Sequence, residues 1–557
     1  MFTMDSLAFL AIAVAILFAA VQRGGDGART MSEKTHRAIC GAAIAAGVLV
    51  RLVRLTSLPA GISAEEALVG VQAKALWQTG GFLFGQGLTT QLSQWSGETT
   101  GPLLAVLTAP FVGLFGMSKL TVRLPLALLS CAAMPAAYGL GEALSGRRAA
   151  RWMLLIAALC PIFVLEARMT CGSCAALYLL PIALCLIARG VTKPAALYPG
   201  MIVLALTAYT QDMYFFIAPA AILACAIIAL IFGRRKRHAV ISGAIGLLLC
   251  VPAMLTAFVN LTGAEGMTLL GLIRIPRLEG FEKAFMAENR SVGDKLWAVL
   301  IGGVFQVLRH ENIHQAMYTP DGMLALFMFS LPLMALGTLA LFARWTDGRR
   351  AAREKAAARA MVAATCAVTL AALVMFGSVG TLNTNGTTGL FDHSALILFD
   401  AVLMTAGLCT IERKNLRCAA AMVALMAVNF AWLAVQLFGG SYQANANVYF
   451  PGFEQMAARA AEIQAETGEK INVTGNIYPH IQPSDGAEMM FLYATDADMR
   501  TAEAERGTRY ETIYVSDDMQ PEADQIYLAR ADEISNWDLE GFDYEESEGY
   551  ALIYPAR

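Results

Sequence analysis

Apolar segments recur along the first 439 residues, and short charged stretches separate them. Most of these segments approach the roughly 20 residues that a helix needs to cross the hydrocarbon core of a bilayer. The chain is therefore expected to be an α-helical polytopic membrane protein with about 12 spans. The predicted spans are 7–21, 38–55, 124–144, 152–165, 173–188, 195–210, 213–232, 239–259, 323–343, 360–376, 390–411 and 419–438.

Clusters of Lys and Arg lie between the apolar segments and predict the orientation. Short cytoplasmic loops are enriched in these residues. All clusters fall on one side if the proline-containing run Pro102–Gly116 lies on the outer surface instead of crossing. The outer side then carries two long segments, 56–123 and 260–320, and the C-terminal tail. The basic clusters are 23–37, 147–151, 189–193, 234–238, 344–359 and 413–417.

Composition divides the chain into two parts. Hydrophobic residues make up 57% of it, charged residues 15%, and the mean hydropathy is +0.54. Residues 440–557 hold 23 acidic and 7 basic residues, a net charge of −16, which leaves +13 for residues 1–439. We predict a membrane domain over 1–439 in the plasma membrane and an acidic extracytoplasmic α/β domain over 440–557. The tail patterns predict a helix at 453–466 and strands at 470–474, 510–516, 525–528 and 550–554.

Basic residues are dispersed between apolar segments, so nucleic acid is not an expected partner, whereas membrane lipids are. All 11 cysteines precede Gly440. Cys171 and Cys174 form a C-x-x-C pair, but no second cysteine pair or nearby histidine supports a redox or metal site. Buried packing is the simpler interpretation of these cysteines, because small apolar-compatible residues are common inside helix bundles.

The segment Pro59–Gly70 follows the second predicted span and carries the clearest local signal. Ser63 and Glu66 form the S-x-x-E capping box that opens a helix. A carboxylate in the first turn also favours the helix dipole, which is the structural interpretation of both acids. The cap leaves Glu65 unexplained, and a carboxylate at the mouth of a helix bundle suits a general base. Glu65 and Glu66 are therefore the candidate catalytic residues.

Outer-face cations are candidates for binding a phosphate. Lys74 shares a helix with the two acids, Arg123 precedes a span, and Arg168 ends one. Arg309 and His310 lie in the second outer segment. For Arg123 and Arg168, a structural or snorkelling anchor at the membrane surface is an equally good interpretation. His393 at an outer helix end is a candidate for substrate contact, whereas the neighbouring Asp392 better suits a helix cap.

Five stretches carry a pattern that is found together in one class of membrane enzymes. They are Pro59–Gly61, Glu65–Gly70, Gln94–Gly97, Pro110–Gly116 and Arg123–Pro125. Together they resemble the GT-C class of membrane glycosyltransferases, especially family 39 protein O-mannosyltransferases and the aminoarabinose transferases that modify lipid A. The stretch that contains Trp95 is similar to a segment of some bacterial members, which makes Trp95 a candidate substrate-binding residue. The resemblance is strongest over residues 45–190.

The resemblance implies transfer of a hexose or pentose from a polyprenyl-phosphate carrier to an acceptor on the outer face of the membrane. One displacement would invert the anomeric carbon, with Glu65 as base or acceptor-orienting group and Glu66 beside it. The sequence departs from the family in three places. Glu65 replaces the usual Asp, Val71 replaces a common Tyr, and the stretch Arg168–Gly172 lacks an acid that many relatives carry.

Two other functions compete with the transferase. A transporter or flippase of lipid-linked glycans often shows internal repeats and helices broken at mid-membrane. This sequence has no evident repeat, and few ionisable residues lie in mid-span, since Arg51, Glu142 and Asp400 are nearer the ends of their predicted spans. A non-catalytic cell-envelope scaffold, with the tail as a binding domain, is the third hypothesis. No cofactor is predicted with certainty, and a divalent metal stays open because two adjacent glutamates supply too few ligands alone. The sequence does not determine the oligomeric state.

Overall fold

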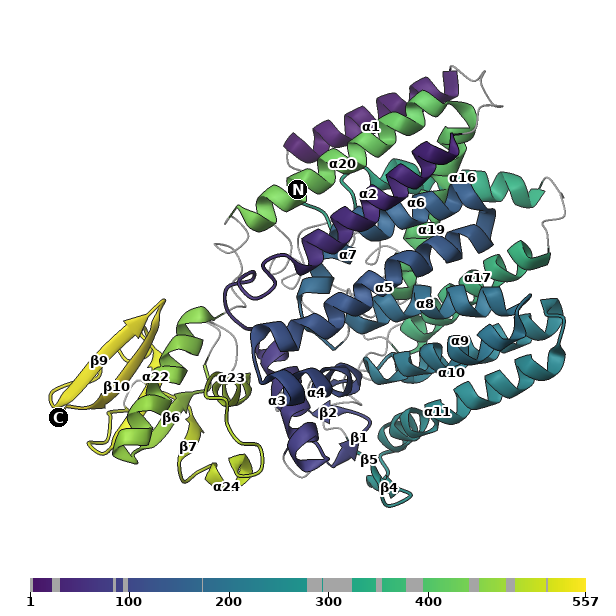
Figure 1. Ribbon diagram of the computed structural model, residues 1–557. Coiled ribbons are helices and arrows are strands. Elements are labelled where there is room, and N and C mark those ends of the chain that lie inside the picture. Colours follow the sequence, from purple (N-terminus) through teal and green to yellow (C-terminus); the bar gives the residue numbers. More distant parts are fainter. Residues whose placement is uncertain are drawn as a thin grey trace.

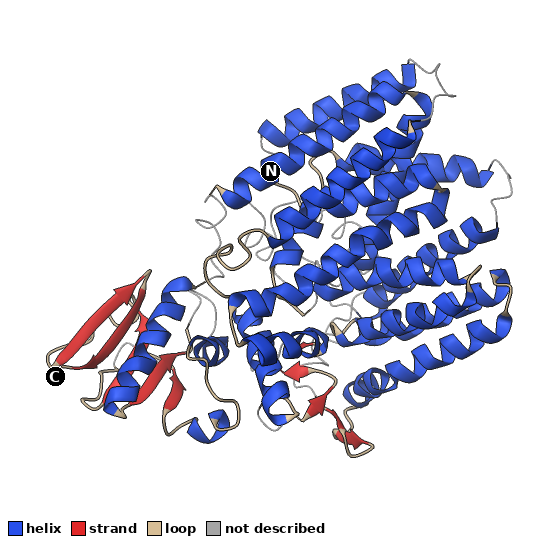
Figure 2. Ribbon diagram, in the orientation of Figure 1, coloured by secondary structure: helices blue, strands red, loops and turns tan. Residues whose placement is uncertain are grey.

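The computed structural model describes residues 4–22, 31–83, 87–93, 99–172, 174–277, 293, 323–346, 353–376, 394–439, 450–476, 486–516 and 519–556. A bundle of long helices carries a small domain at one end, and this domain contains the C-terminus (Figure 1). Figure 2 shows strands in this domain and in short pieces near the same end of the bundle. The predicted fold class, a helical membrane protein with a C-terminal α/β domain, is confirmed.

The helices follow the predicted spans. Seven helices of the described part are long and apolar enough to cross a membrane: α2 (Glu33–Leu52), α5 (Lys119–Ser145), α10 (Tyr214–Phe232), α11 (Lys236–Thr262), α17 (Arg353–Phe376), α19 (Ser394–Lys414) and α20 (Leu416–Phe438). The bent pair of α6 (Arg147–Leu159) with α7 (Pro161–Leu165) and the short helix after it reaches the same length and hydropathy, so the described part has eight such segments if this pair is one broken span. The four remaining predicted spans coincide with shorter apolar helices: α1 (Met4–Gln22), α8 (Cys174–Gly190), α9 (Leu197–Leu206) and α16 (Ser330–Thr346).

The bend between α6 and α7 follows from Pro161. Proline has no N–H, so the carbonyl of Ala157 loses its helical donor. Arg51 of α2 replaces that donor, since its Nη2 lies 2.8 Å from this oxygen and its Nη1 3.1 Å from the oxygen of Ala158. The buried guanidinium thereby meets the negative end of the α6 dipole. The bend directs the short helix η1 (Glu166–Arg168) toward the end of α2.

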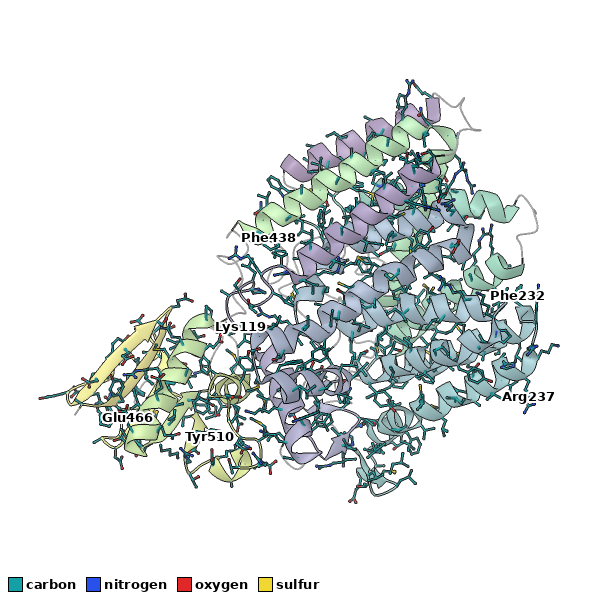
Figure 3. The ribbon with its side chains drawn as sticks, viewed as in Figure 1. Lys119, Phe232, Arg237, Phe438, Glu466 and Tyr510 are labelled. Atoms are coloured by element: carbon teal, nitrogen blue, oxygen red, sulfur yellow. The ribbon has the colours of Figure 1, made fainter. Side chains whose placement is uncertain are left out.

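Residues from several basic clusters meet at one end of the bundle. Arg151 Nη2 lies 2.5 Å from Oε2 of Glu412, which precedes the last cluster, and Arg151 Nη1 lies 3.1 Å from Nδ1 of His36. These buried side chains join the start of α2, the start of α6 and the end of α19. Figure 3 places Arg237, from another cluster, at the end of the bundle away from the C-terminal domain. The structure thus gathers clusters that the sequence assigned to one side.

The first outer loop packs at the opposite end. Helix α3 contacts α4, and α4 continues onto the start of α5. Figure 1 shows α3, α4 and short strands beside the ends of the bundle helices. This position suits the prediction that Pro102–Gly116 does not cross the membrane. The elements of this region are α3 (Ala64–Thr79), β1 (Leu88–Thr89), β2 (Leu92–Ser93), β3 (Thr99–Thr100), α4 (Leu103–Phe115), β4 (Met267–Leu269) and β5 (Ile273–Ile275).

The C-terminal domain has a five-stranded sheet in the order β7-β6-β8-β10-β9. Strand β6 is parallel to both of its neighbours, and β10 is antiparallel to β8 and β9. The predicted helix and four predicted strands are present, but the edge strand β9 was missed because its acidic side chains hide the alternation of a strand. The elements are α22 (Pro451–Thr467), β6 (Lys470–Thr474), α23 (Gly486–Ala494), α24 (Ala502–Glu505), β7 (Tyr510–Ile513), β8 (Gln525–Arg530), β9 (Phe542–Ser547) and β10 (Tyr550–Pro555).

This domain docks on the first outer loop. Helix α23 packs against α3, and the two share one apolar core with α22 and the inner strands. Lys119 of α5 forms an ion pair with Glu454 of α22 at 2.7 Å, and Figure 3 shows Lys119 where the bundle meets the domain. The predicted domain boundary at residue 440 falls in 440–449, outside the described residues.

Candidate active site

The helix that carries the two acids begins as the sequence predicts. The Ser63 hydroxyl accepts a hydrogen bond from the Glu66 N–H at 3.2 Å, and the Ser63 N–H donates to the Glu66 carboxylate at 3.4 Å. This capping box makes Ser63 the N-cap of α3 and confirms the S-x-x-E interpretation. The cap fixes both acids in the first turn of α3, but it gives them different surroundings.

Glu66 is buried in an ion pair. Arg123 donates through Nε to Oε1 and through Nη2 to Oε2 of this carboxylate, each at 2.8 Å. The N–H of Thr170 also donates to Oε1 at 3.2 Å, so the carboxylate accepts four hydrogen bonds when that from the Ser63 N–H is included. Both charged side chains are only 1% exposed. Glu66, predicted as a second catalytic acid, therefore has a geometry that favours a structural role, since its oxygens are already occupied.

Arg123 also ties down the loop between α2 and α3. Its Nη1 donates to the carbonyls of Leu55 and Pro59 at 3.1 and 2.9 Å, and its Nη2 donates to that of Gly61 at 2.7 Å. Together with the two bonds to Glu66, these contacts use all five N–H groups of a guanidinium. The geometry therefore argues against the predicted phosphate contact and for the alternative of a structural anchor.

Arg168 serves a similar structural purpose at the end of α2. Its Nη1 donates to the carbonyls of Val50 and Val53 at 2.6 and 3.0 Å, and its Nη2 donates to those of Arg54 and Leu58 at 3.2 and 2.9 Å. The last carbonyls of a helix have no intrahelical donors and carry partial negative charge. Arg168, a predicted phosphate ligand, thus caps α2 and is buried rather than snorkelling.

Lys74 contacts the C-terminal domain. Its Nζ lies 2.5 Å from Oδ1 of Asp496 and 2.8 Å from the carbonyl of the same residue. The lysine side chain is 13% exposed and its ammonium group is paired with Asp496. Lys74, predicted to bind the donor phosphate, is thus engaged with the C-terminal domain. The three predicted cations that the structure describes are therefore all engaged with protein groups.

Glu65 differs from Glu66 both in its burial and in its hydrogen bonding. Its side chain is half-buried, and among the described residues it makes no hydrogen bond or ion pair. The buried carboxyl of Glu166 lies close enough for electrostatic interaction with Glu65. A half-buried carboxylate without a protein partner is available to bind a substrate hydroxyl.

Glu166 was missed by the sequence analysis. It is buried in η1, and the Cys174 thiol donates to its Oε2 at 2.8 Å. The resemblance places a second acid after Arg168, whereas in the structure an acid that precedes this arginine, beyond the bend at Pro161, lies within electrostatic range of Glu65. The sequence feature that could have indicated Glu166 is its position just after an apolar run that contains Pro161.

Two motif glycines are explained by close packing. A Cβ on Gly61 would lie 2.7 Å from the backbone nitrogens of Phe450 and Pro451. A Cβ on Gly70 would lie 2.9 Å from Val122 and 3.3 Å from the ring of Tyr493. Burial raises the pKa of Tyr493, and the nearby carboxylates of Glu454 and Glu66 add to this effect. Because Gly61 and Gly70 have no Cβ, the C-terminal domain can pack closely against both of them, and α5 can pack closely against Gly70.

Three predicted site residues, Trp95, His310 and His393, lie outside the described residues, as do Arg309 and Asp392. In the described part, no group of three or more His, Cys, Asp or Glu side chains is arranged to hold a metal ion. Neither Cys171 nor Cys174 forms a disulfide bond, and both are buried.

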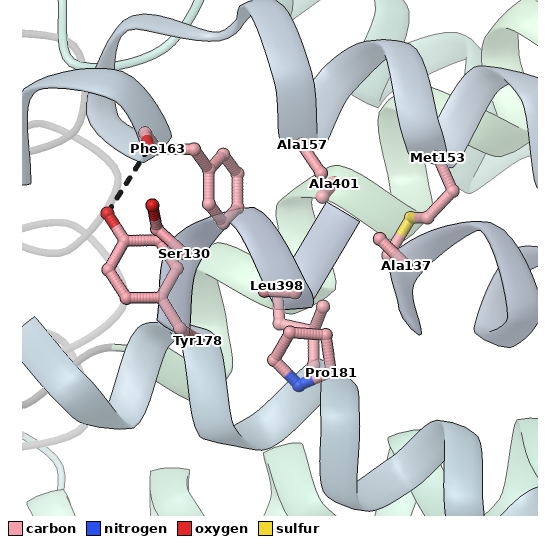
Figure 4. A pocket seen from close by; sticks show the side chains of 10 residues that line it. Ser130, Ala137, Met153, Ala157, Phe163, Tyr178, Pro181, Leu398 and Ala401 are labelled. Carbon is pink, nitrogen blue, oxygen red and sulfur yellow. Dashed lines mark hydrogen bonds between the residues drawn. The ribbon is translucent and has the colours of Figure 1, made fainter. Parts of the chain in front are cut away.

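A small cavity lies inside the bundle. Ser130, Phe163 and Tyr178 line it, and the Tyr178 hydroxyl donates to the Phe163 carbonyl at 3.2 Å (Figure 4). Its volume of about 10 Å³ is near the minimum that one water molecule needs. A sugar does not fit there, so the half-buried carboxylate of Glu65 is the better candidate for chemistry.

Comparison with known proteins shows the fold. No family model matches the sequence. No curated protein matches it either. The structure is similar to ArnT from Cupriavidus metallidurans bound to undecaprenyl phosphate, with a TM-score of 0.55 and 10% identity over 93% of this chain and 98% of that one. The predicted resemblance to the aminoarabinose transferases of the GT-C class is therefore confirmed at the level of the fold.

A second similar structure is the archaeal oligosaccharyltransferase AglB from Archaeoglobus fulgidus, solved with an inhibitory peptide and a dolichol-phosphate. Its TM-score is 0.46 and its identity 12%, over 83% of this chain. This chain spans 63% of the length of that structure.

Proposed function

We propose that the chain is a membrane glycosyltransferase that moves a sugar from a polyprenyl-phosphate carrier to an acceptor hydroxyl or amine. The observation that carries the proposal is the contrast within α3. Glu66 is consumed by the buried ion pair with Arg123, whereas Glu65 keeps a half-buried carboxylate without a hydrogen bond in the described part of the chain. The fold shared with ArnT, a structure that holds undecaprenyl phosphate, supports the donor class.

In the proposed reaction, Glu65 accepts the proton of the acceptor group as that group attacks the anomeric carbon. The bond from this carbon to the carrier phosphate breaks, the phosphate departs with the electron pair, and the configuration inverts. The frame of Arg123, Thr170 and Glu66 holds both the first turn of α3 and the loop that follows Glu166. This frame keeps the reacting carboxylate in place, and such positioning accounts for much of catalytic power.

The leaving phosphate needs cations that stabilise its charge. Since Lys74, Arg123 and Arg168 are engaged with protein groups, we assign this role to the outer segment 260–320. Arg309 and His310 are its predicted phosphate ligands. A divalent metal remains an alternative source of this charge.

We also propose that the site and the C-terminal domain face the extracytoplasmic side. Both lie at the end of the bundle opposite Arg237, and cytoplasmic loops are the ones enriched in Lys and Arg. Ala504 in the C-terminal domain is exposed, so a cysteine there reports the compartment. An impermeant maleimide should label Ala504→Cys in intact cells, and labelling only after lysis would contradict the proposed sidedness.

The transferase is tested with membranes that contain the protein and labelled polyprenyl-phosphate sugars. The wild-type chain should consume the carrier, and Glu65→Gln should abolish consumption because an amide cannot accept the proton. The matched control is Glu540→Gln, an exposed glutamate of the C-terminal domain outside the segments assigned to the reaction, which should leave the rate unchanged.

The competing functions give other outcomes. A scaffold would consume no carrier in either form. A flippase would move the carrier across the bilayer without breaking its sugar–phosphate bond, and Glu65→Gln would leave the amount of intact carrier unchanged.

A further inference from the structure

A short hairpin follows the membrane-spanning helix α11. Strands β4 and β5 are antiparallel, with Met267 opposite Ile275 and Leu269 opposite Ile273. The N–H of Leu272 donates to the carbonyl of Leu269 at 3.1 Å and closes a tight turn. Leu270 and Gly271 occupy its two central positions, with φ of 53° and 69°. Positive φ at both positions is typical of a type I′ turn.

The residue at the first central position is unusual. Type I′ turns favour Asn-Gly or Asp-Gly, because Asn and Asp tolerate positive φ and are soluble at an exposed tip. This chain instead has Leu270, a bulky residue for which positive φ is rare. Leucine at this position does not stabilise a turn that is exposed to water. Its presence therefore indicates that the Leu270 side chain lies in an apolar environment.

The tip is also open. Leu270 is 86% exposed and Leu272 is 68% exposed, and Met267 at the start of the hairpin is exposed as well. Single exposed apolar residues are common on protein surfaces, but three on one short hairpin form a small apolar patch. Charged side chains flank it, with exposed Glu265 before the hairpin and exposed Arg277 after it.

The position of the hairpin identifies the partner. Helix α11 ends at Thr262, and only Gly263–Gly266 separate this membrane span from β4. Met254 and Phe258 in the last turns of α11 are exposed on the bundle, as expected for a surface that faces lipid. Figure 1 shows the hairpin directly beyond the end of α11, outside the bundle. The apolar tip therefore continues a lipid-facing surface into the interfacial region.

The hairpin is joined to the loop of the candidate site. Strand β5 pairs in parallel with β1, with Leu88 opposite Ile273 and Thr89 opposite Arg274. Strand β1 belongs to the first outer loop, between α3 and α4. We propose that the tip of the β4–β5 hairpin inserts into the membrane interface and anchors the first outer loop to the bilayer. This inference does not depend on the reaction that the protein catalyses.

The test uses a polarity-sensitive fluorophore on single introduced cysteines, with the full chain in vesicles of phosphatidylcholine and phosphatidylglycerol. Leu270→Cys is the probe of the tip, and Leu272→Cys repeats the measurement if the first variant folds poorly. Leu248→Cys, on an exposed position of α11, gives the lipid reference, and Ala504→Cys gives the aqueous reference. Unmodified protein treated in parallel gives the background from native cysteines, all of which are buried or half-buried.

The proposal predicts a blue-shifted emission at the tip, and quenching by lipids that carry a spin label near the head group. Iodide in the water should quench the tip less than it quenches the label at Ala504. Quenching by iodide equal to that at Ala504, with no effect of the spin-labelled lipid, would refute the proposal. Protection of the tip from both quenchers would also refute it, because a protein surface and not lipid would then cover the hairpin.

Discussion

Substituting Glu66 with glutamine tests the buried ion pair on which the site rests. The amide keeps the size of the side chain but removes its charge, which leaves Arg123 buried with three carbonyls and no carboxylate. Breaking a buried pair by removing one partner destabilises proteins by roughly 3–5 kcal/mol. The hydrogen bonds from Nε and Nη2 at 2.8 Å both lose the negative charge of their acceptor, and one of them loses its acceptor altogether because an amide has a single oxygen. We therefore expect Glu66→Gln to lower stability by about 3–5 kcal/mol.

The matched variant is Glu65→Gln, one residue away on the same helix turn. Glu65 is half-buried and has no hydrogen bond among the described residues, so its substitution should change stability by less than about 0.5 kcal/mol. The pair of variants separates stability from chemistry. Glu65→Gln should keep the fold and lose transfer, whereas Glu66→Gln should lose stability first.

Thermal unfolding in detergent micelles measures the difference, with a thiol-reactive dye as the reporter. All cysteines except Cys40 and Cys131 are buried, so unfolding exposes new thiols to the dye. The midpoint of Glu66→Gln should fall by several degrees relative to Glu65→Gln, in line with the few degrees per kcal/mol of mid-sized domains. Equal midpoints for the two variants would refute the argument that the buried pair stabilises the loop.

The other predictions concern the supporting contacts. Gly61→Ala should cost about 1–3 kcal/mol through overpacking, and faster proteolytic release of the C-terminal domain would show that this domain has loosened. The hydrogen bond from Arg500 lowers the pKa of Asp498 below its ordinary 3.8. The stability that it contributes is thus present above pH 3.8 and is lost as the pH falls through the lower folded value, and acid unfolding of Asp498→Asn should lack this component. Cys174→Ala should destabilise by about 1–3 kcal/mol by removing the donor to buried Glu166, and Cys174→Ser should restore most of this in thermal unfolding.

Local patterns were sufficient for the membrane spans and for the helix and four strands predicted in the C-terminal domain. Each predicted span coincides with an apolar helix, because crossing a bilayer depends on hydropathy within one continuous segment. The capping box at Ser63 formed for the same reason, since its hydrogen bonds join residues three positions apart. The strand Phe542–Ser547 was not predicted, because it lies at a sheet edge, where acidic side chains face water and no apolar alternation is required.

The roles of the charged residues depended on contacts between distant parts of the chain. Glu65 and Glu66 are adjacent and chemically identical, and only the packing of Arg123, 57 positions beyond Glu66, distinguishes the structural acid from the available one. Lys74 contacts Asp496, which is 422 positions away in the C-terminal domain. Glu166, beyond the bend at Pro161, lies within electrostatic range of Glu65. Hydropathy acts within a segment and can be deduced from sequence. The partner of a buried charge is chosen by desolvation and hydrogen bonding in the folded protein, so only the tertiary structure decides it.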